Sequence, residues 1–182
     1  MPPRYETVEV TVDDATIADG DVWKIIEPVW WLADIYNGPD EYHRSLRQFS
    51  AEQRQMFALR WYLSEVNNGG HHQFYSNATG VVWKDACKAF RAINIKKGAD
   101  IILASADRMG GNPSLDRELR YEQLAEYDPD FNDLDESPYE LEKNTDIEKA
   151  AFAFIRDRSA AFHFSGEITR IVLPNVTDDS RE

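Results

Sequence analysis

Residues 50–77 read SAEQRQMFALRWYLSEVNNGGHHQFYSN, and this stretch decides the fold. Ser50 followed three positions later by Gln53 is a capping-box pattern, which predicts a helix that begins at residue 51. The residues after the cap are so rich in large apolar side chains that we expect this helix near the centre of the core. The apolar residues are Met56, Phe57, Leu59, Trp61, Tyr62, Leu63 and Val66. The Asn-Asn-Gly-Gly run at 67–70 predicts that the helix stops there.

The residues around this stop predict a sharp corner between two buried helices. Glycine supplies the positive φ that a tight turn needs, and asparagine tolerates it. Gln73 and Asn77 are four positions apart, so they share one helical face. We expect their amides to join Asn67 or Asn68 in a buried polar network.

The same segment also admits a chemical interpretation, a catalytic or metal centre built on His71 and His72 with Glu65. Adjacent residues on a helix point about 100° apart, so the two histidines do not readily chelate one ion. The chain also lacks a nucleophile elbow, a phosphate loop and a dinucleotide fingerprint. We therefore favour the structural interpretation and predict a non-enzymatic protein with no metal and no cofactor.

Helical periodicity continues through most of the chain. It predicts helices over about 22–36, 40–49, 82–93, 99–109 and 115–127. Thr145 and Glu148 form a second capping-box pattern, which opens a last long helix that we expect to end at Gly166. Alternating apolar residues at 8–12 and 168–173 predict two strands that pair at the edge of the domain. The fold class is therefore all-α, with about seven helices in one domain over 1–182, an extended arm over about 1–18 and a frayed tail over about 175–182.

Five tryptophans have two possible roles, an aromatic pocket for a ligand or part of the core. Their helical spacing favours the core. They are Trp23, Trp30, Trp31, Trp61 and Trp83.

The charge balance excludes several classes of partner. The 182 residues hold 33 acidic and 20 basic side chains, a net charge of −13. Such a surface repels phosphates and anionic lipid heads, which excludes direct nucleic-acid and membrane binding and favours a basic protein partner. No apolar run is long enough to span a bilayer, and the first residues lack the apolar segment of a secretory signal. Cys87 is the single cysteine, so no internal disulfide forms, and we predict a cytoplasmic protein.

Most of the excess charge lies in one stretch. Residues 116–148 hold 13 acidic and 3 basic side chains. Glu118, Glu122 and Glu126 line one helix face at steps of about 6 Å, and a DNA strand presents a phosphate about every 3.4 Å along its axis. The remaining candidates for a partner-binding acidic surface are Asp128, Asp130, Asp133, Asp135, Glu136, Glu140 and Glu142. The alternative is a solvated face that keeps the protein soluble.

The segment WYLSEVNNGGHHQFYSN at 61–77, followed by Thr79-Gly80, resembles the signature of a DNA-mimic family of small, acidic, all-helical bacterial proteins. Its most specific residues are Asn67, Asn68, Gly69, Gly70, Gln73 and Asn77. The resemblance extends over roughly 20–165. His71 stands where the signature favours a bulkier apolar or aromatic residue.

This resemblance implies an all-α, non-enzymatic homodimer in which the signature is structural. It implies that surface carboxylates arranged like phosphates occupy the DNA-binding face of a transcription factor. We therefore expect a DNA mimic that sequesters a basic DNA-binding protein. The alternatives are an immunity or antitoxin protein that neutralises a basic toxin, and the enzyme or metal protein centred on His71 and His72.

Overall fold

The computed structural model describes residues 3–172, with the side chains of residues 137, 139 and 142 excepted. The described part has ten α-helices, two short 3-10 helices and two strands, and seven α-helices have ten residues or more, which confirms the all-α class. The α-helices are α1 (Asp14–Ala18), α2 (Val22–Leu32), α3 (Pro39–Ser45), α4 (Ala51–Ser76), α5 (Trp83–Ala92), α6 (Lys96–Arg108), α7 (Arg117–Tyr127), α8 (Asn132–Asn144), α9 (Ile147–Arg156) and α10 (Ser159–Phe162). The other elements are β1 (Arg4–Val12), η1 (Leu46–Gln48), η2 (Ala78–Val82) and β2 (Phe164–Val172).

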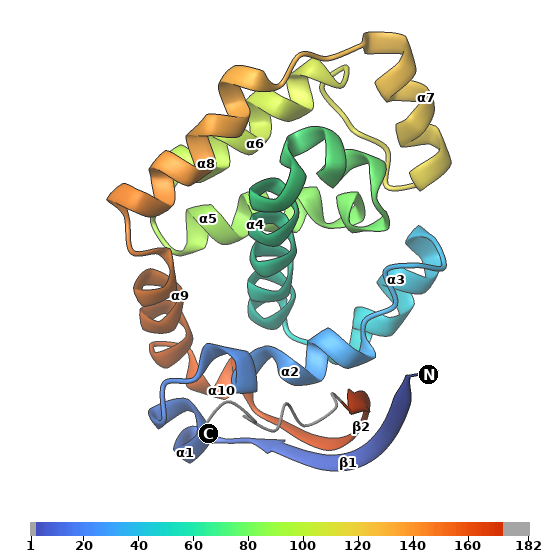
Figure 1. Ribbon diagram of the computed structural model, residues 1–182. Coiled ribbons are helices and arrows are strands. Elements are labelled where there is room, and N and C mark those ends of the chain that lie inside the picture. The colour runs from blue at the N-terminus through green and yellow to red at the C-terminus, as the bar shows by residue number, and fades with distance from the viewer. Residues whose placement is uncertain (1–2, 173–182) are drawn as a thin grey trace, which may run out of the picture.

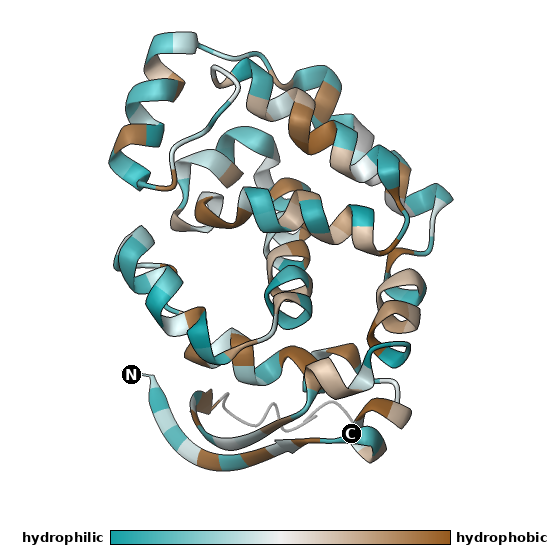
Figure 2. Ribbon diagram, turned by 180° about the vertical axis from the view of Figure 1, so that it is seen from behind, coloured by the Kyte–Doolittle hydropathy of each residue, from teal (hydrophilic) through white to brown (hydrophobic). Residues whose placement is uncertain are grey.

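Helix α4 passes through the middle of the molecule (Figure 1). Its first half lies against α2, and its second half contacts α5, α7 and α8. Buried aromatic side chains along α4, such as Phe57, Tyr62 and Phe74, hold these neighbours together. Each surrounding helix carries hydrophobic and hydrophilic positions in turn along its length (Figure 2), as expected of amphipathic helices around one core. The apolar central helix predicted from the sequence is therefore confirmed.

The two strands form an antiparallel pair below α2, in register from Arg4 opposite Val172 to Val12 opposite Phe164. Val12 and Ile168 are buried, and the alternate residues Val8 and Val10 are half-buried, so the register follows the apolar alternation. The predicted strand pair is thus confirmed. Gly166 lies inside β2, and the prediction that it ends a long last helix is wrong. Helix α9 ends at Arg156, a turn and the short helix α10 follow, and from Phe164 onward the backbone gains its hydrogen bonds by pairing with β1.

The helix starts were predicted with mixed success. The capping box of Ser50 and Gln53 is confirmed, with both reciprocal hydrogen bonds present at 2.9 and 3.0 Å. The second capping box is wrong, because Asp146 caps α9 through a 2.8 Å bond from the Lys149 N–H. The predicted arm over about 1–18 is strand β1 followed by helix α1, and the predicted frayed tail lies outside the described residues.

Helix α8 was not predicted. Its apolar positions have helical spacing, since Phe131 and Leu141 are buried and Leu134 is half-buried. Acidic residues and Pro138 obscure this pattern in the sequence, although the helix continues through the proline.

The tryptophans are divided between the core and the surface. Trp83 is buried, and Trp30 and Trp61 stack with their ring centroids 4.3 Å apart. Trp23 is 39% exposed, so the prediction of core packing is wrong for this residue. In residues 3–172, no helix combines the length and the apolar character that crossing a membrane requires.

Candidate functional site

A kink divides α4 at the Asn-Asn-Gly-Gly run. Gly69 has φ −155° and ψ 24°, and Gly70 has φ 72° and ψ −173°, neither of which is helical. The predicted corner is present, and the predicted stop is confirmed, because the regular helix is interrupted at the two glycines. A second helical segment resumes at once in a new direction and continues to Ser76, so α4 consists of two helical segments joined at a kink.

Glu65 lies at the centre of the polar network beside this kink. It is 8% exposed and accepts three side-chain hydrogen bonds, from Gln73 at 2.8 Å, Asn77 at 2.9 Å and Thr79 at 3.0 Å. The predicted pairing of Gln73 and Asn77 in one network is thus confirmed. The acceptor, however, is a buried carboxylate rather than an asparagine. Asn67 and Asn68 are exposed on the outer side of the corner.

His71 is fully buried directly after the kink. Its Nδ1 lies 2.5 Å from Asp135 Oδ1, its backbone N–H donates to the same oxygen at 2.9 Å, and its Nε2 lies 2.9 Å from the Tyr62 hydroxyl. The kink frees the N–H of His71 from the helix, and the Asp135 carboxylate from α8 caps the resumed segment. His71 and Glu65 are thus both enclosed and hydrogen-bonded, while His72 is exposed, which does not support a catalytic centre built on these residues.

We expect His71 to make stability depend on pH. Burial lowers the pKa of His71, and this effect outweighs the opposing effect of its hydrogen bond to the Asp135 carboxylate. As the pH falls below about 6.5, the unfolded chain binds the proton before the folded one. The stability is therefore full above that pH and falls by up to about 1.4 kcal/mol per pH unit below it.

Urea unfolding between about pH 7.5 and 5 measures this loss. His71→Gln should flatten the slope below about pH 6.5, and His72→Gln, which removes the exposed neighbour, controls for the loss of a histidine as such. A wild-type slope in the His71→Gln variant would contradict the assignment.

Arg120 of α7 holds the far end of the second half of α4. Its guanidinium is fully buried and donates to five backbone carbonyls. They belong to Tyr75, Asn77, Ala78, Ser114 and Leu115, at 2.7–3.4 Å. Burial lowers the pKa of Arg120 to about 10, so the group keeps its positive charge at neutral pH. Three of these carbonyls belong to the end of α4 and the residues after it, where a cation is favoured.

The signature segment therefore positions both acidic helices. Arg120 attaches α7 to the end of α4, and Asp135 attaches α8 to its kink. Sequence periodicity did not indicate either residue, because both lie in a stretch that reads as a solvated acidic face.

The acidic stripe predicted on α7 is present. Glu118, Glu122 and Glu126 are all exposed, and none forms an ion pair within the described part of the chain. Each step of four residues rises about 6 Å along the axis. The three carboxylates therefore form a row on the outer side of α7.

The other acidic candidates differ in position. The exposed ones are Asp128, Asp130, Asp133, Glu136 and Glu140. Asp133 forms two hydrogen bonds with Arg108 at 2.6 and 2.8 Å, and the backbone carbonyl of Asp130 accepts from the same guanidinium. Asp135 is half-buried, and its carboxylate reaches the α4 kink, where it accepts hydrogen bonds from His71. The Glu142 side chain lies outside the described residues.

Within the described residues, no group of three or more histidine, cysteine or acidic side chains is arranged to hold a metal ion.

Comparison with known proteins gives a family. The family model described as DMP19-like protein matches residues 47–158, which include the signature and both acidic helices. This finding corrects the identification made from the signature, since the family found is the DMP19-like family and the match is narrower than 20–165. No curated protein and no solved structure matches the chain.

Proposed function

Since the chain belongs to the DMP19-like protein family, we propose that it is a non-enzymatic, acidic binding protein of the cytoplasm. In this proposal, the exposed carboxylates of α7 and α8 stand in for DNA phosphates. They occupy the DNA-binding face of a basic protein such as a transcription factor, and so compete with DNA for it.

The row of Glu118, Glu122 and Glu126 carries this proposal. Three exposed carboxylates on one rigid face, none of them paired with a base in the described part of the chain, are available to lysine and arginine side chains of a partner. A face that only kept the protein soluble would not need such a regular row, since scattered charges serve as well.

The internal contacts of Arg120 and Asp135 support the proposal from a second direction. A phosphate mimic has to hold its charges at fixed positions before the partner arrives, because ordering them on binding costs affinity. Arg120 fixes α7, and Asp135 fixes α8, each through hydrogen bonds to the α4 backbone.

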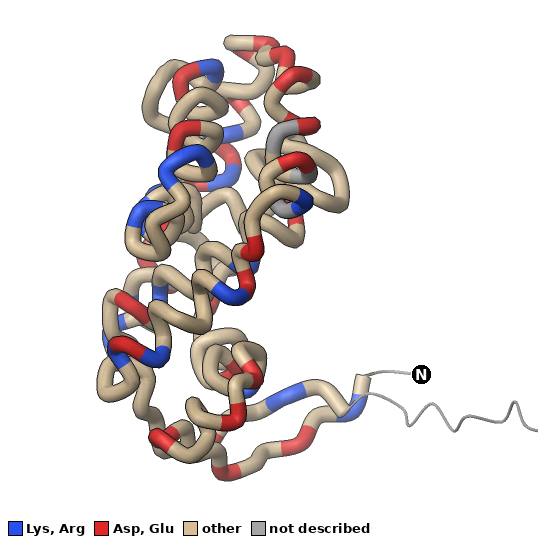
Figure 3. The backbone as a smooth tube through the Cα atoms, turned by 90° about the vertical axis from the view of Figure 1, so that its left-hand side faces the viewer, with Lys and Arg blue, Asp and Glu red and all other residues tan. Residues whose placement is uncertain are grey.

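The electrostatic field of the whole protein also favours a basic partner. A net charge of −13 attracts a basic protein over long distances and speeds its association. In the tube view of Figure 3, acidic positions recur from α8 down to the start of α9. Binding through such charges should weaken steeply as salt rises.

A capture experiment tests this proposal. The protein is immobilised, host lysate is applied at low salt, and bound proteins are eluted with a salt step and identified by mass spectrometry. We expect basic DNA-binding proteins in the eluate, and a gel-shift assay should show the captured protein leaving its DNA as the wild-type protein is added. The Glu118→Gln, Glu122→Gln, Glu126→Gln triple variant should bind the captured protein about 10–100-fold more weakly, because each lost charge contact contributes about 0.5–1 kcal/mol or more.

The matched control removes three exposed carboxylates at the opposite end of the molecule. The variant Glu9→Gln, Asp19→Asn, Glu167→Gln changes the net charge by the same amount and should retain capture. Equal losses of binding affinity in the two triple variants would mean that binding depends on net charge alone and not on the position of the carboxylates. Unchanged capture by the α7 variant would exclude the stripe as the binding surface.

A further inference from the structure

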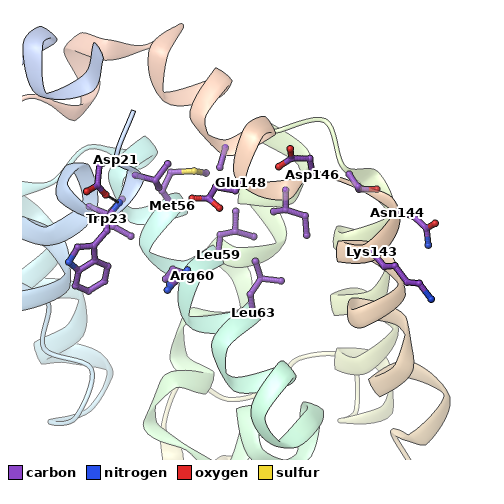
Figure 4. A pocket seen from close by; sticks show the side chains of 15 residues that line it. Asp21, Trp23, Met56, Leu59, Arg60, Leu63, Lys143, Asn144, Asp146 and Glu148 are labelled. Carbon is purple, nitrogen blue, oxygen red and sulfur yellow. Dashed lines mark hydrogen bonds between the residues drawn. The ribbon is translucent and has the colours of Figure 1, made fainter. Parts of the chain in front are cut away.

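An open cavity of about 710 Å3 lies between α2, α4 and α9 (Figure 4). Its floor follows α4, where Met56, Leu59 and Leu63 form a stripe at i, i+3 and i+7. The first residues of α9 close one side, where the buried side chain of Ile147 lines the cavity. Trp23 of α2 stands at the mouth, 39% exposed. This volume is typical of a site that takes a compact apolar group.

Three carboxylates and two basic side chains surround this apolar floor. Asp21, Asp146 and Glu148 line the cavity, against the bases Arg60 and Lys143. Lys143 lies 3.6 Å from Glu140 on its own helix, so part of its charge is already balanced. Arg60 forms no ion pair in the described part of the chain.

The cavity is continuous with the acidic surface of α8. Asp146 and Glu148 follow directly on α8, and Glu136 and Glu140 are exposed on that helix. The acidic positions that Figure 3 shows on α8 therefore continue into Asp146 and Glu148, which line the cavity. A basic partner that covers α8 would also reach the cavity.

We propose that the cavity takes the apolar side chains of a basic amphipathic helix in the partner, while the lysines or arginines of that helix pair with Glu148 and its acidic neighbours. This inference rests on the proposed function and adds an apolar anchor to the electrostatic contact. The stripe on α4 spans seven residues, about 10 Å, which matches two turns of a docked helix. Helix-in-groove recognition uses apolar anchors at this spacing.

Two synthetic peptides distinguish the contribution of the apolar anchor to binding from the contribution of charge. One is a synthetic leucine–lysine helix with its leucines on one face, and the other is a lysine–serine peptide of the same length and charge. Titration is followed by tryptophan fluorescence at physiological ionic strength, with the signal of the cavity assigned by Trp23→Phe. The leucine–lysine helix should bind about tenfold more tightly, because it buries at least one leucine side chain.

Variants at the rim test where the helix binds. Glu148→Gln should weaken the leucine–lysine helix several-fold, and Trp23→Ala should remove most of its tenfold advantage, provided that circular dichroism shows the variant folded. Arg60→Glu should tighten binding several-fold, because it replaces the repelling base of the rim with an acid. Arg91→Glu makes the same substitution at an exposed position that does not line the cavity, and it should have a smaller effect.

The outcomes distinguish this inference from the proposed function. Equal binding of the two peptides, insensitive to the rim variants, would overturn the cavity inference and leave the acidic surface in place. Failure of both peptides to bind would overturn both. Weaker binding in Arg60→Glu than in the wild type would mean that the cavity prefers an anionic ligand, which also contradicts the inference.

Discussion

Replacing Arg120 by methionine should lower the free energy of unfolding by about 3–5 kcal/mol, since several buried carbonyls lose their donor at once. Methionine fills most of the space of the arginine stem, so the loss reflects hydrogen bonding more than a cavity. The carbonyls of Tyr75 and Asn77 have the shortest of these contacts at the end of α4, and we expect them to be affected most.

Urea denaturation of the Arg120 variants measures this effect. Arg120→Lys keeps the charge but loses the planar fork, so it should fall between the wild type and Arg120→Met. Arg117→Met is the matched control, because Arg117 is exposed and its side chain donates mainly to the Ser76 carbonyl at 2.9 Å. We expect it to cost less than about 1 kcal/mol. If Arg120→Met costs no more than this control, Arg120 does not hold the end of α4.

Gly70→Ala is the second change with a large expected effect, a loss of about 3–5 kcal/mol. The backbone at Gly70, φ 72° and ψ −173°, belongs to a region that is essentially restricted to glycine. A Cβ atom there would also stand 2.2 Å from Asp135 Oδ2. The carboxylate would have to move away and would lose its hydrogen bonds to His71.

A variant at a second glycine distinguishes the backbone cost from the cost of displacing the Asp135 carboxylate. Gly38 has nearly the same backbone, φ 91° and ψ 174°, but a Cβ atom there meets nothing within 4 Å. Gly38→Ala should therefore show the backbone cost alone, about 1–3 kcal/mol. The difference between the two variants in thermal or urea unfolding reports the Asp135 contact. Equal losses would show that Asp135 adds nothing at the kink.

The sequence predicted those parts of the fold that depend on local pattern. The capping box at Ser50, the corner at Gly70 and the strand pair all follow from short-range chemistry or from alternation of apolar residues. Helix α8 is not predicted from the sequence, because its apolar positions are few and its first turn is acidic, although Phe131, Leu134 and Leu141 have helical spacing. Gly166 was misread because a glycine after a helical pattern is typical of a helix end and also fits a strand.

The site was predicted less completely than the fold, for a physical reason. Exposure of Glu118, Glu122 and Glu126 follows from a helix with one polar face, and the structure agrees. The inward roles of Asp135 and Arg120 depend on partners far away in the sequence, which periodicity does not reveal. Only Arg120 left a signal in the sequence, which is its mismatch with the surrounding charges. Arg120 is a base within an acidic run, at a position between the turns of the glutamate stripe.

The register of the two strands has a consequence for the order of folding during synthesis. The hydroxyls of Thr7 and Thr169 meet at 3.0 Å across 162 positions of sequence, so β1 is synthesised before β2 and has no strand partner until β2 emerges from the ribosome. The helices between them contact near neighbours such as α4 with α5 and α5 with α6, and they are able to pack while translation continues. We therefore expect nascent chains that stop before residue 164 to show helical packing but an N-terminal segment open to proteases, and that segment to become protected when synthesis passes β2.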